Sequence, residues 1–236
     1  MKKKLILIGI TVLLVVTFTA CRLIDSNDSN LKNDENNTET EATDEKDIEK
    51  ETEKIEYEYT EEGIIKPEIA EKVIKETSDK LINAISTKDV ETILEYVHPV
   101  KGVRFTPYTN VSVEKDVVFN IEKIKEFFND QEVYLWGYYD GRGNEIYLTP
   151  TNYYEEFLYT EDFINAEEIG YNEVLSSGNS AENQFEVYEN AIVVEYYFSG
   201  FNPEFGGADW KSIRLVFEEY EGSWKLVGII NNQWTI

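Results

Sequence analysis

One abrupt change of composition divides this chain near residue 66 and limits where a folded core can form. From Arg22 to Lys66 the sequence holds 16 acidic and 6 basic side chains and no proline, and Asn, Thr and Ser make up most of the rest. Such a stretch cannot bury enough apolar area to offset the entropy of ordering it, so we expect residues 21–66 to form a disordered acidic linker. Residues 67–236 are long enough for one domain with its own core.

Two uses of the linker remain open. It can serve only as a tether that holds the domain away from its attachment point, or it can contain a partner-binding segment built on Ile55, Tyr57 and Tyr59. The run "DIEKETEKIEYEY" also allows a transient helix, because Glu and Lys recur there at helical spacing.

The first 20 residues have the pattern of a secretory signal peptide. Lys2, Lys3 and Lys4 precede the apolar run "LILIGITVLLVV", and "TFTAC" follows it. A membrane-spanning helix needs about 20 predominantly apolar residues, and this run is shorter. We therefore expect residues 1–20 to be removed as a signal.

Cys21 is the only cysteine, and it stands where such a signal is cut. With Thr19 and Ala20 before it, and Phe18 in place of the usual leucine, the segment resembles the lipobox of bacterial lipoproteins. The resemblance implies that Cys21 is lipidated and that the protein is anchored to the bacterial cell membrane on its extracytoplasmic face. A diacylglyceryl group holds a chain stably, since each buried methylene contributes about 0.8 kcal/mol. The alternative is an incidental thiol at the end of a true membrane anchor.

Charge restricts the partners of the domain. Residues 67–236 carry 31 acidic and 13 basic side chains, a net charge of −18. A field of this sign repels nucleic acid and anionic lipid head groups, so nucleic acid is excluded as a partner. Cationic partners, cationic peptides and divalent metals remain compatible with it, as does an acidic surface that is merely solvated.

Helices come first in the domain. Pro67 begins a helix in which apolar residues recur at spacing four as far as Ile85. Asp89 is the expected N-cap of a second helix. That helix ends at His98, because the residue before Pro99 is restricted to an extended conformation.

Strands dominate the rest. "VRFTPYTNV" predicts a strand, at a sheet edge or a bulge because of Pro107, and Asn120 caps a short helix. "VYLWGYY" and "EIYLT" predict a hairpin around "DGRGN", and Thr149 caps a further short helix. Three strand-like runs finish the chain: "FEVYENAIVVEYYF", "WKSIRLVFEEY" and "SWKLVGIINNQWTI", the last two joined by a tight turn at residues 220–223. This order predicts an α+β fold with N-terminal helices packed on a mainly antiparallel sheet.

The end of the chain resembles a known superfamily. Alternation places Trp224, Leu226 and Ile230 on one face of the last strand. The pattern G-x-W-x-L-x-x-I, made by Gly222, Trp224, Leu226 and Ile229, together with "AISTKDVETILEYVHP", is similar to the NTF2-like (cystatin-like, α+β cone) superfamily. The resemblance implies that the helices pack on a strongly curved sheet and enclose a cone. The whole chain is also similar to bacterial lipoproteins that carry such a domain, which implies a location and a fold but no activity.

Arginine and aromatic residues on strands are the candidates for ligand binding. Arg104 and Arg214 could each bind a carboxylate in bidentate fashion and stack on aromatic rings, or each could be held by an internal carboxylate. Strand tryptophans and tyrosines could line a carbohydrate or peptide groove, although such residues are more often core. The candidate ligand-binding residues are Arg104, Tyr108, Trp136, Tyr138, Trp210 and Arg214.

No catalytic centre can be assigned from the sequence. An acid–base centre would use one carboxylate with a raised pKa and a tyrosine donor; Asp140, Asp209, Tyr108 and His98, the only histidine, could compose one, but one sequence cannot show that they converge. His98 is instead expected to cap the carbonyls at the end of the second helix. A metal site built from His and Cys is excluded by the presence of one residue of each, and no cofactor is predicted.

Three functions stay open. A binding or accessory domain for an envelope protein, a peptide or cell-wall material predicts an open pocket lined by arginine and aromatic residues. A homodimerisation or assembly module predicts a filled cone and an exposed apolar sheet face. An acid–base enzyme, such as an isomerase or hydratase, predicts a buried carboxylate with a raised pKa beside a tyrosine or histidine.

Overall fold

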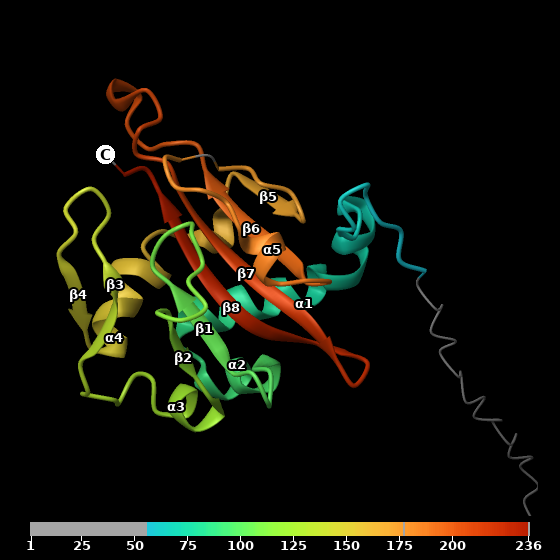
Figure 1. Ribbon diagram of the computed structural model, residues 1–236, viewed down its shortest axis with the longest axis horizontal. Helices are drawn as coiled ribbons and strands as arrows, with labels where there is room; N and C mark the ends of the chain where they lie inside the picture. The colour runs from blue at the N-terminus through green and yellow to red at the C-terminus, as the bar shows by residue number, and fades with distance from the viewer. Residues whose placement is uncertain (1–55, 177, 236) are drawn as a thin grey trace, which may run out of the picture. The chain divides into compact units, whose positions relative to one another are not determined.

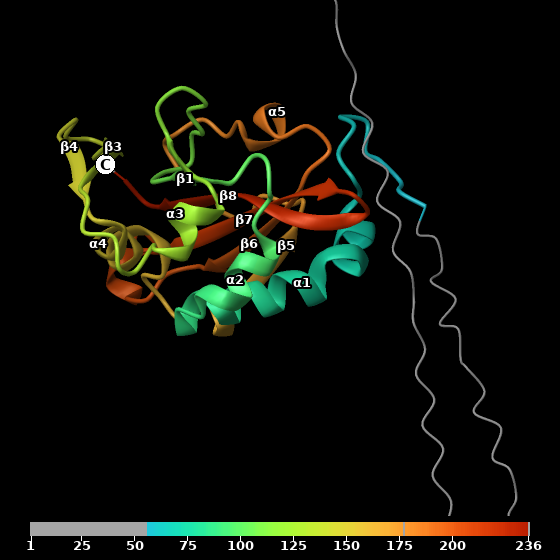
Figure 2. The same ribbon diagram turned by 90° about the horizontal axis from the view of Figure 1, so that it is seen from below.

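The computed structural model describes residues 56–176 and 178–235, whose arrangement Figures 1 and 2 show in two views. The signal peptide, Cys21 and the linker as far as Ile55 lie outside the described residues. A six-stranded sheet forms the middle of the domain (Figure 2), with helices α1 (Pro67–Thr87) and α2 (Val90–Tyr96) on one face. Loops and the helical turn α5 (Gln184–Val187) cover the other face. The predicted α+β architecture is thus present.

The sheet has the strand order β2-β1-β8-β7-β6-β5. Its strands are β1 (Val103–Thr106), β2 (Val117–Phe119), β5 (Glu168–Tyr171), β6 (Ile192–Phe198), β7 (Lys211–Tyr220) and β8 (Ser223–Gln233). Every neighbouring pair is antiparallel except β1 and β8, which run parallel. The long strands are therefore central and the edge strands are short.

A separate two-stranded hairpin closes one end of the helical side. It consists of β3 (Tyr134–Tyr138) and β4 (Glu145–Leu148), as the sequence predicts. Helix α3 (Ile121–Lys125) precedes it, and α4 (Pro150–Tyr153) follows and continues into a π-helical turn, Tyr154–Leu158. The hairpin thereby brings an aromatic strand against the core.

The two predicted helices form where the caps require. Pro67 occupies the first turn of α1, and a stripe including Ile74 and Leu81 is fully buried. Asp89 accepts a hydrogen bond of 3.2 Å from the backbone N–H of Thr92 and so caps α2. These local signals position the helical layer on the sheet.

The β7–β8 hairpin turns at Glu221 and Gly222, which both have positive φ, the conformation of the tight turns that fit the twist of two strands. A β-bulge interrupts the register opposite Val216 and Phe217. Because the bulge adds one residue, Leu226 faces the helices while Ile230 faces the opposite side. The prediction that these two residues share a face is therefore wrong.

Three further sequence expectations need correction. The strand expected through Pro107 ends at Thr106, and β1 is paired on both sides instead of lying at an edge. Pro107 has no backbone N–H to donate, so the ladder of hydrogen bonds ends before it. The run 185–198 is a strand only from Ile192, since residues 184–187 form α5. Strand β5 carries no clear alternation and was not expected.

The packed domain also begins before residue 67. Tyr57 packs edge-on against Trp224, with ring centroids 6.2 Å apart. Ile65 is 2% exposed and belongs to the core, and its carbonyl accepts a 2.9 Å hydrogen bond from the side-chain amide of Asn172. The apolar residues that end the acidic stretch are thus part of the fold, which moves the boundary of the linker toward the N-terminus.

Candidate functional site

The space between the helices and the sheet is filled by aromatic rings. Trp136 is fully buried, stacks on Tyr153 at 3.8 Å between centroids, and donates its indole N–H to the Leu148 carbonyl at 2.9 Å. Other rings in this cluster include Phe105, Phe119, Phe127 and Phe157. The cavity left over is about 30 Å³, room for about two water molecules. It is lined by apolar and aromatic residues such as Ile93 and Leu226.

None of the six predicted ligand-binding residues lines that cavity. Pockets that take small molecules are about 300–1,000 Å³ and combine apolar walls with a few convergent polar groups. The cone has neither the volume nor the polar groups. The open, arginine-lined pocket expected for small-ligand binding in the cone is therefore absent from the part of the domain that is described.

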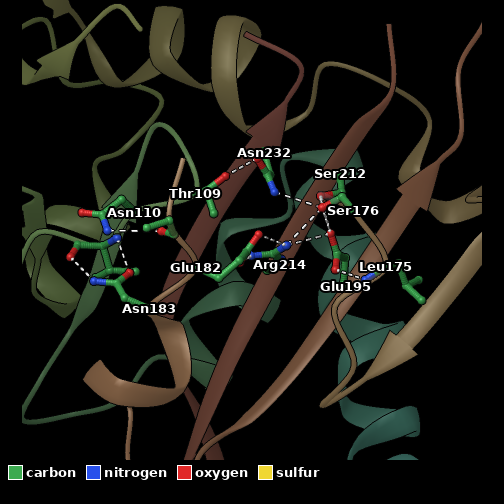
Figure 3. A network of polar contacts seen from close by, with 12 residues as sticks. Thr109, Asn110, Leu175, Ser176, Glu182, Asn183, Glu195, Ser212, Arg214 and Asn232 are labelled. Atoms are coloured by element: carbon green, nitrogen blue, oxygen red, sulfur yellow. Dashed lines mark hydrogen bonds and ion pairs between the residues drawn. The ribbon is translucent and has the colours of Figure 1, made fainter. Parts of the chain in front are cut away.

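A buried ion pair lies on the opposite face of the sheet (Figure 3). Arg214 on β7 stands in register with Glu195 on β6, and Arg214 Nη2 lies 3.2 Å from Glu195 Oε1. The side chains of Arg214 and Glu195 are 1% and 0% exposed. Glu182 completes the set: both of its carboxylate oxygens contact the guanidinium of Arg214, one of them at 3.2 Å.

Hydroxyl and amide groups supply most of the remaining hydrogen bonds of this cluster, and only Nε of Arg214 is buried there without a partner among the described residues. Ser176 donates its hydroxyl to Glu195 and accepts from Arg214 Nη2 at 3.0 Å and from Asn232 Nδ2 at 2.9 Å. Ser212 donates to Glu195 Oε1 at 2.6 Å. Strand β7 and the loop that contains Ser176 thus meet at the buried carboxylate of Glu195 on β6, and β8 is joined to them through Asn232.

Electrostatics keep the guanidinium charged. Burial by itself lowers the pKa of Arg214, but Glu195 and Glu182 outweigh burial, so its pKa is raised above the ordinary value. A buried ion pair contributes little net stability relative to apolar packing, yet removing one partner leaves an uncompensated charge. The cluster therefore fixes which segment covers this face and gives little ground for a catalytic role.

A second set of bonds fastens the covering loops to each other. Asn183 donates from Nδ2 to the Val111 carbonyl at 2.9 Å and accepts from the Val111 N–H at 2.8 Å. Asn110 donates to the carbonyl of Ala181 at 3.2 Å. Figure 3 shows these contacts beside the Arg214 cluster. The outer face of the sheet is thereby closed by its own loops.

Arg104 is also used internally. It lies on the same sheet face as Arg214, with β8 between their strands, because Arg104 pairs with Gly228 and Arg214 with Ile230. Its Nη1 donates to the carbonyls of Ser112 and Val113 at 3.2 and 3.1 Å. This arginine holds the loop after β1 through backbone carbonyls, and its charge also acts on the nearby carboxylate of Asp116.

The predicted aromatic residues are dispersed. Tyr108 packs edge-on against Phe157, with centroids 5.8 Å apart, and Trp210 is buried beside Tyr197 at 6.2 Å. Tyr138 lies exposed at the end of β3. Tyr108 thus joins the aromatic cluster of Trp136 through Phe157 and Tyr153, whereas Tyr138 and Trp210 lie outside that cluster.

His98 is a structural residue. Its Nδ1 accepts hydrogen bonds of 3.1 Å from the N–H groups of Val100 and Lys101, and its ring packs edge-on against Tyr220. Burial lowers its pKa, so the neutral ring is favoured. The ring thus fixes the turn after α2. The expectation that it caps the carbonyls at the end of this helix is wrong, because its Nδ1 accepts hydrogen bonds from N–H groups.

The acid–base candidates do not converge on that histidine. Asp209 accepts from the N–H groups of Phe201 and Asn202 within its own loop. Asp140 accepts from Thr235 and from Gly141 near the C-terminus. No single site of the kind expected for an acid–base enzyme gathers these residues with His98.

One carboxylate with a raised pKa was missed by sequence reasoning. Burial raises the pKa of Asp116, although hydrogen bonds from Thr106 Oγ1 at 2.7 Å and from the Ser112 N–H at 2.9 Å act in the opposite direction. Thr106 is the last residue of β1, and Ser112 belongs to the loop that Asp116 closes. Asp116 thus shapes this loop beside β1, and its charge, after burial, also helps to raise the pKa of the buried Tyr153.

Glu182, Glu195 and Ser176 were also missed. Glu195 is the only charge inside the apolar run "IVVEYYF", and this placement is a signal that a buried partner exists. No signal in the sequence identifies Glu182 or Ser176, because both come from an irregular polar loop. Their contribution depends on how that loop folds over the sheet.

Comparisons with known proteins add little. No family model and no curated protein matches the chain. A solved structure described as a calcium/calmodulin-dependent protein kinase II association domain from Xanthomonas campestris aligns at 12% identity and a TM-score of 0.28, covering 68% of this chain and 84% of that one. A TM-score this low does not establish a shared fold, so nothing about this chain follows from it.

Two further observations bear on sites. Among residues 56–176 and 178–235, no group of three or more His, Cys, Asp or Glu side chains is arranged to hold a metal ion. Within the same residues, no helix has the length and apolar character needed to cross a membrane.

Proposed function

We propose that this protein is a lipid-anchored extracytoplasmic lipoprotein whose domain is a binding or accessory module, and that it engages a protein partner through its surface. The observation that carries the proposal is a filled cone, in which aromatic rings leave about 30 Å³, together with an outer sheet face that is covered by loops and so lacks the exposed apolar face expected of an assembly module. A domain with no room for a small ligand in its core acts on others through what it exposes.

The internal use of both strand arginines supports the same proposal. Arg214 is neutralised by Glu195 and Glu182, and Arg104 is bound to backbone carbonyls. The guanidinium of Arg214 is not available to an anionic ligand without breaking these contacts, and Nη1 of Arg104 is occupied by two carbonyls. The assignment to the NTF2-like superfamily and the lipid on Cys21 belong to the proposal and rest on the sequence patterns described above.

The anchor is tested by metabolic labelling of bacterial cells that express the full chain, with a fatty acid that carries an alkyne tag. The wild-type chain is expected to incorporate the label and the Cys21→Ser variant to incorporate none, since Cys21 is the only cysteine. Equal labelling of both chains would disprove lipidation at this residue.

The partner is tested by treating intact cells with a crosslinker that does not cross the membrane. We expect a discrete adduct between this chain and a different protein. Uncrosslinked chain alone would contradict the proposal, and a homodimeric adduct alone would favour the assembly-module alternative. Ile93→Phe, which fills the residual cavity of the cone, should leave the adduct unchanged. If this variant folds but gives no adduct, the cone cavity itself is needed for partner binding and the proposal of a surface contact is wrong.

A further inference from the structure

An acidic, aromatic groove lies where the N-terminal segment meets the tip of the β7–β8 hairpin. It has a volume of about 360 Å³, within the range of known ligand sites. In Figure 1 the segment and the hairpin tip lie at the same end of the domain. The groove is lined by Tyr57, Tyr59, Ile65, Glu189, Asn190, Glu218, Glu219 and Trp224.

Three aromatic rings give the groove a surface suited to a cation. Tyr57 meets Trp224 edge-on at 71° between ring planes, and both are partly exposed. Tyr59 is 47% exposed, so its ring is open to a ligand in the groove. The faces of such rings attract ammonium and guanidinium groups within about 6 Å.

Carboxylates surround these rings, and two of them have no countercharge. Glu218 pairs with Lys101, but Glu189 and Glu219 form no ion pair with any residue of 56–176 or 178–235. Besides burial, the charge of Glu219 raises the pKa of Tyr57, which shows that this carboxylate acts on the ring. No lysine or arginine is among the residues that line the groove.

The groove continues into a second cavity of about 360 Å³ that shares Glu189 and Asn190 with it. This neighbour adds the carboxylates of Glu62 and Glu186, again with no basic residue in its lining. The carboxylates are not grouped as metal ligands among the described residues. Their spread along two adjoining cavities suits several positive charges on one extended chain.

We infer that this groove binds a basic segment of a partner protein, with one lysine or arginine side chain placed over the rings of Tyr57, Tyr59 and Trp224. Charge complementarity is the reason for choosing a peptide over an apolar ligand: the carboxylates attract successive cations while the rings select one of them. The inference rests on the proposed function only in that the partner is taken to be a protein.

The test is calorimetric titration of the full chain, in nonionic detergent, with the peptides tetra-lysine, tetra-arginine and tetra-glutamate, and with choline. Both basic peptides should bind with one-to-one stoichiometry and more weakly as salt is added, and tetra-glutamate should not bind. Glu189→Gln combined with Glu219→Gln should weaken tetra-lysine at least tenfold. Tyr59→Ser should weaken it about two- to fivefold, the share of an exposed cation–π contact.

A matched control separates this site from general attraction to an acidic protein. Glu68→Gln combined with Glu71→Gln removes the same charge from the exposed surface of α1 and should leave affinity within about twofold. Equal weakening by both double variants would overturn the site, as would absence of binding by either basic peptide. Tight binding of choline with no binding of the peptides would assign the groove to a small quaternary ammonium ligand and overturn the inference.

Failure of this inference can be told apart from failure of the proposed function. If the crosslinked adduct persists in cells that express the Glu189→Gln, Glu219→Gln variant, the partner binds elsewhere and only the groove assignment falls. If the wild-type chain yields no heteromeric adduct, the proposed function falls whatever the peptides do.

Discussion

Arg214 and Glu195 face each other from neighbouring strands, in register, with no solvent contact and 3.2 Å between Nη2 and Oε1. Neither residue lies on the helical side of the sheet, so the pair is not part of the apolar core. It is held from above by Glu182 and Ser176, which come from the loop that covers this face. The fit of that loop to the sheet is therefore linked to the charge state of three side chains.

The first prediction concerns this pair. Arg214→Met should lower the free energy of unfolding by about 3–5 kcal/mol, because it leaves the carboxylate of Glu195 buried without a cation. Combining Arg214→Met with Glu195→Leu should recover a large part of that loss, since both charges are then absent. Urea denaturation of the two single variants and the double variant gives the coupling energy, and strict additivity would contradict the buried pair.

The second prediction compares two glycines with nearly the same backbone conformation. Gly102 and Gly143 have φ of +68° and +70°, but a Cβ at Gly102 would lie 2.3 Å from the Phe119 carbonyl oxygen whereas one at Gly143 meets open space. Gly143→Ala should cost about 1–2 kcal/mol from the left-handed backbone alone. Gly102→Ala should cost at least about 2 kcal/mol more, because the backbone of β2 must move. Similar thermal midpoints for the two variants would refute the close approach.

The third prediction is a pH dependence from His98. Burial lowers its pKa, and protonation would place a hydrogen on Nδ1, which now accepts from Val100 and Lys101. Its contribution to stability is therefore complete above the unfolded pKa, about 6.5, and is lost as pH falls below that value. Glu218 nearby acts in the opposite sense, while Lys101 adds to the lowering.

The measurement for His98 is the denaturation midpoint at pH 7.5 and at pH 5.5, for wild type and His98→Asn. Asparagine can accept the same two backbone N–H groups through its carbonyl oxygen and does not titrate. The variant should lose less stability than wild type between these pH values. An identical loss in both proteins would show that other groups cause it.

The fourth prediction concerns Asp116, whose shift has the opposite sign to that of a typical paired carboxylate. Because burial raises its pKa in the folded state, ionisation opposes folding, and stability from this group falls as pH rises from about 3.9 upward. Asp116→Asn should keep both hydrogen bonds, since Thr106 and Ser112 donate to the same oxygen.

At pH 7 the free energy of unfolding of Asp116→Asn should be no more than about 0.5 kcal/mol below that of wild type, and it can exceed it. Asp116→Ala should lose about 1–3 kcal/mol because two donors are left without an acceptor. The advantage of the amide over the acid should shrink at pH 4. An amide variant as unstable as the alanine variant at pH 7 would show that the negative charge itself supports the loop.

Sequence reasoning located the features that depend on neighbours in the chain. Asp89, Asn120 and Thr149 cap helices as predicted, since each cap bonds an N–H three residues on. It failed at the bulge beside Val227, because residues of both parities in β8 are apolar and alternation cannot reveal a shift there. The facing of Ile230 follows from that single extra residue.

The candidate site shows the same division. Alternation along β7 predicts that the side chain of Arg214 lies on the other face of the sheet from those of Ile213 and Leu215. Whether it meets a ligand or an internal acid could not, because the answer depends on Glu182, which reaches it from a loop 32 residues earlier in the chain. Tyr57 and Tyr59 were named as a possible contact segment, a prediction that nothing here tests, and the acidic neighbours that line the groove with them come from distant elements that only the fold brings together.

The edge strands of the sheet have one more consequence. β2 and β5 have only three and four residues, against ten and eleven in β7 and β8. An unpaired strand edge is a template on which another copy can add, and its hazard grows with length and with crowding. We propose that this chain is anchored to a membrane, where copies are crowded in two dimensions. Crowding favours the addition of one copy to the sheet edge of another, and the short outer strands offer little edge for such pairing.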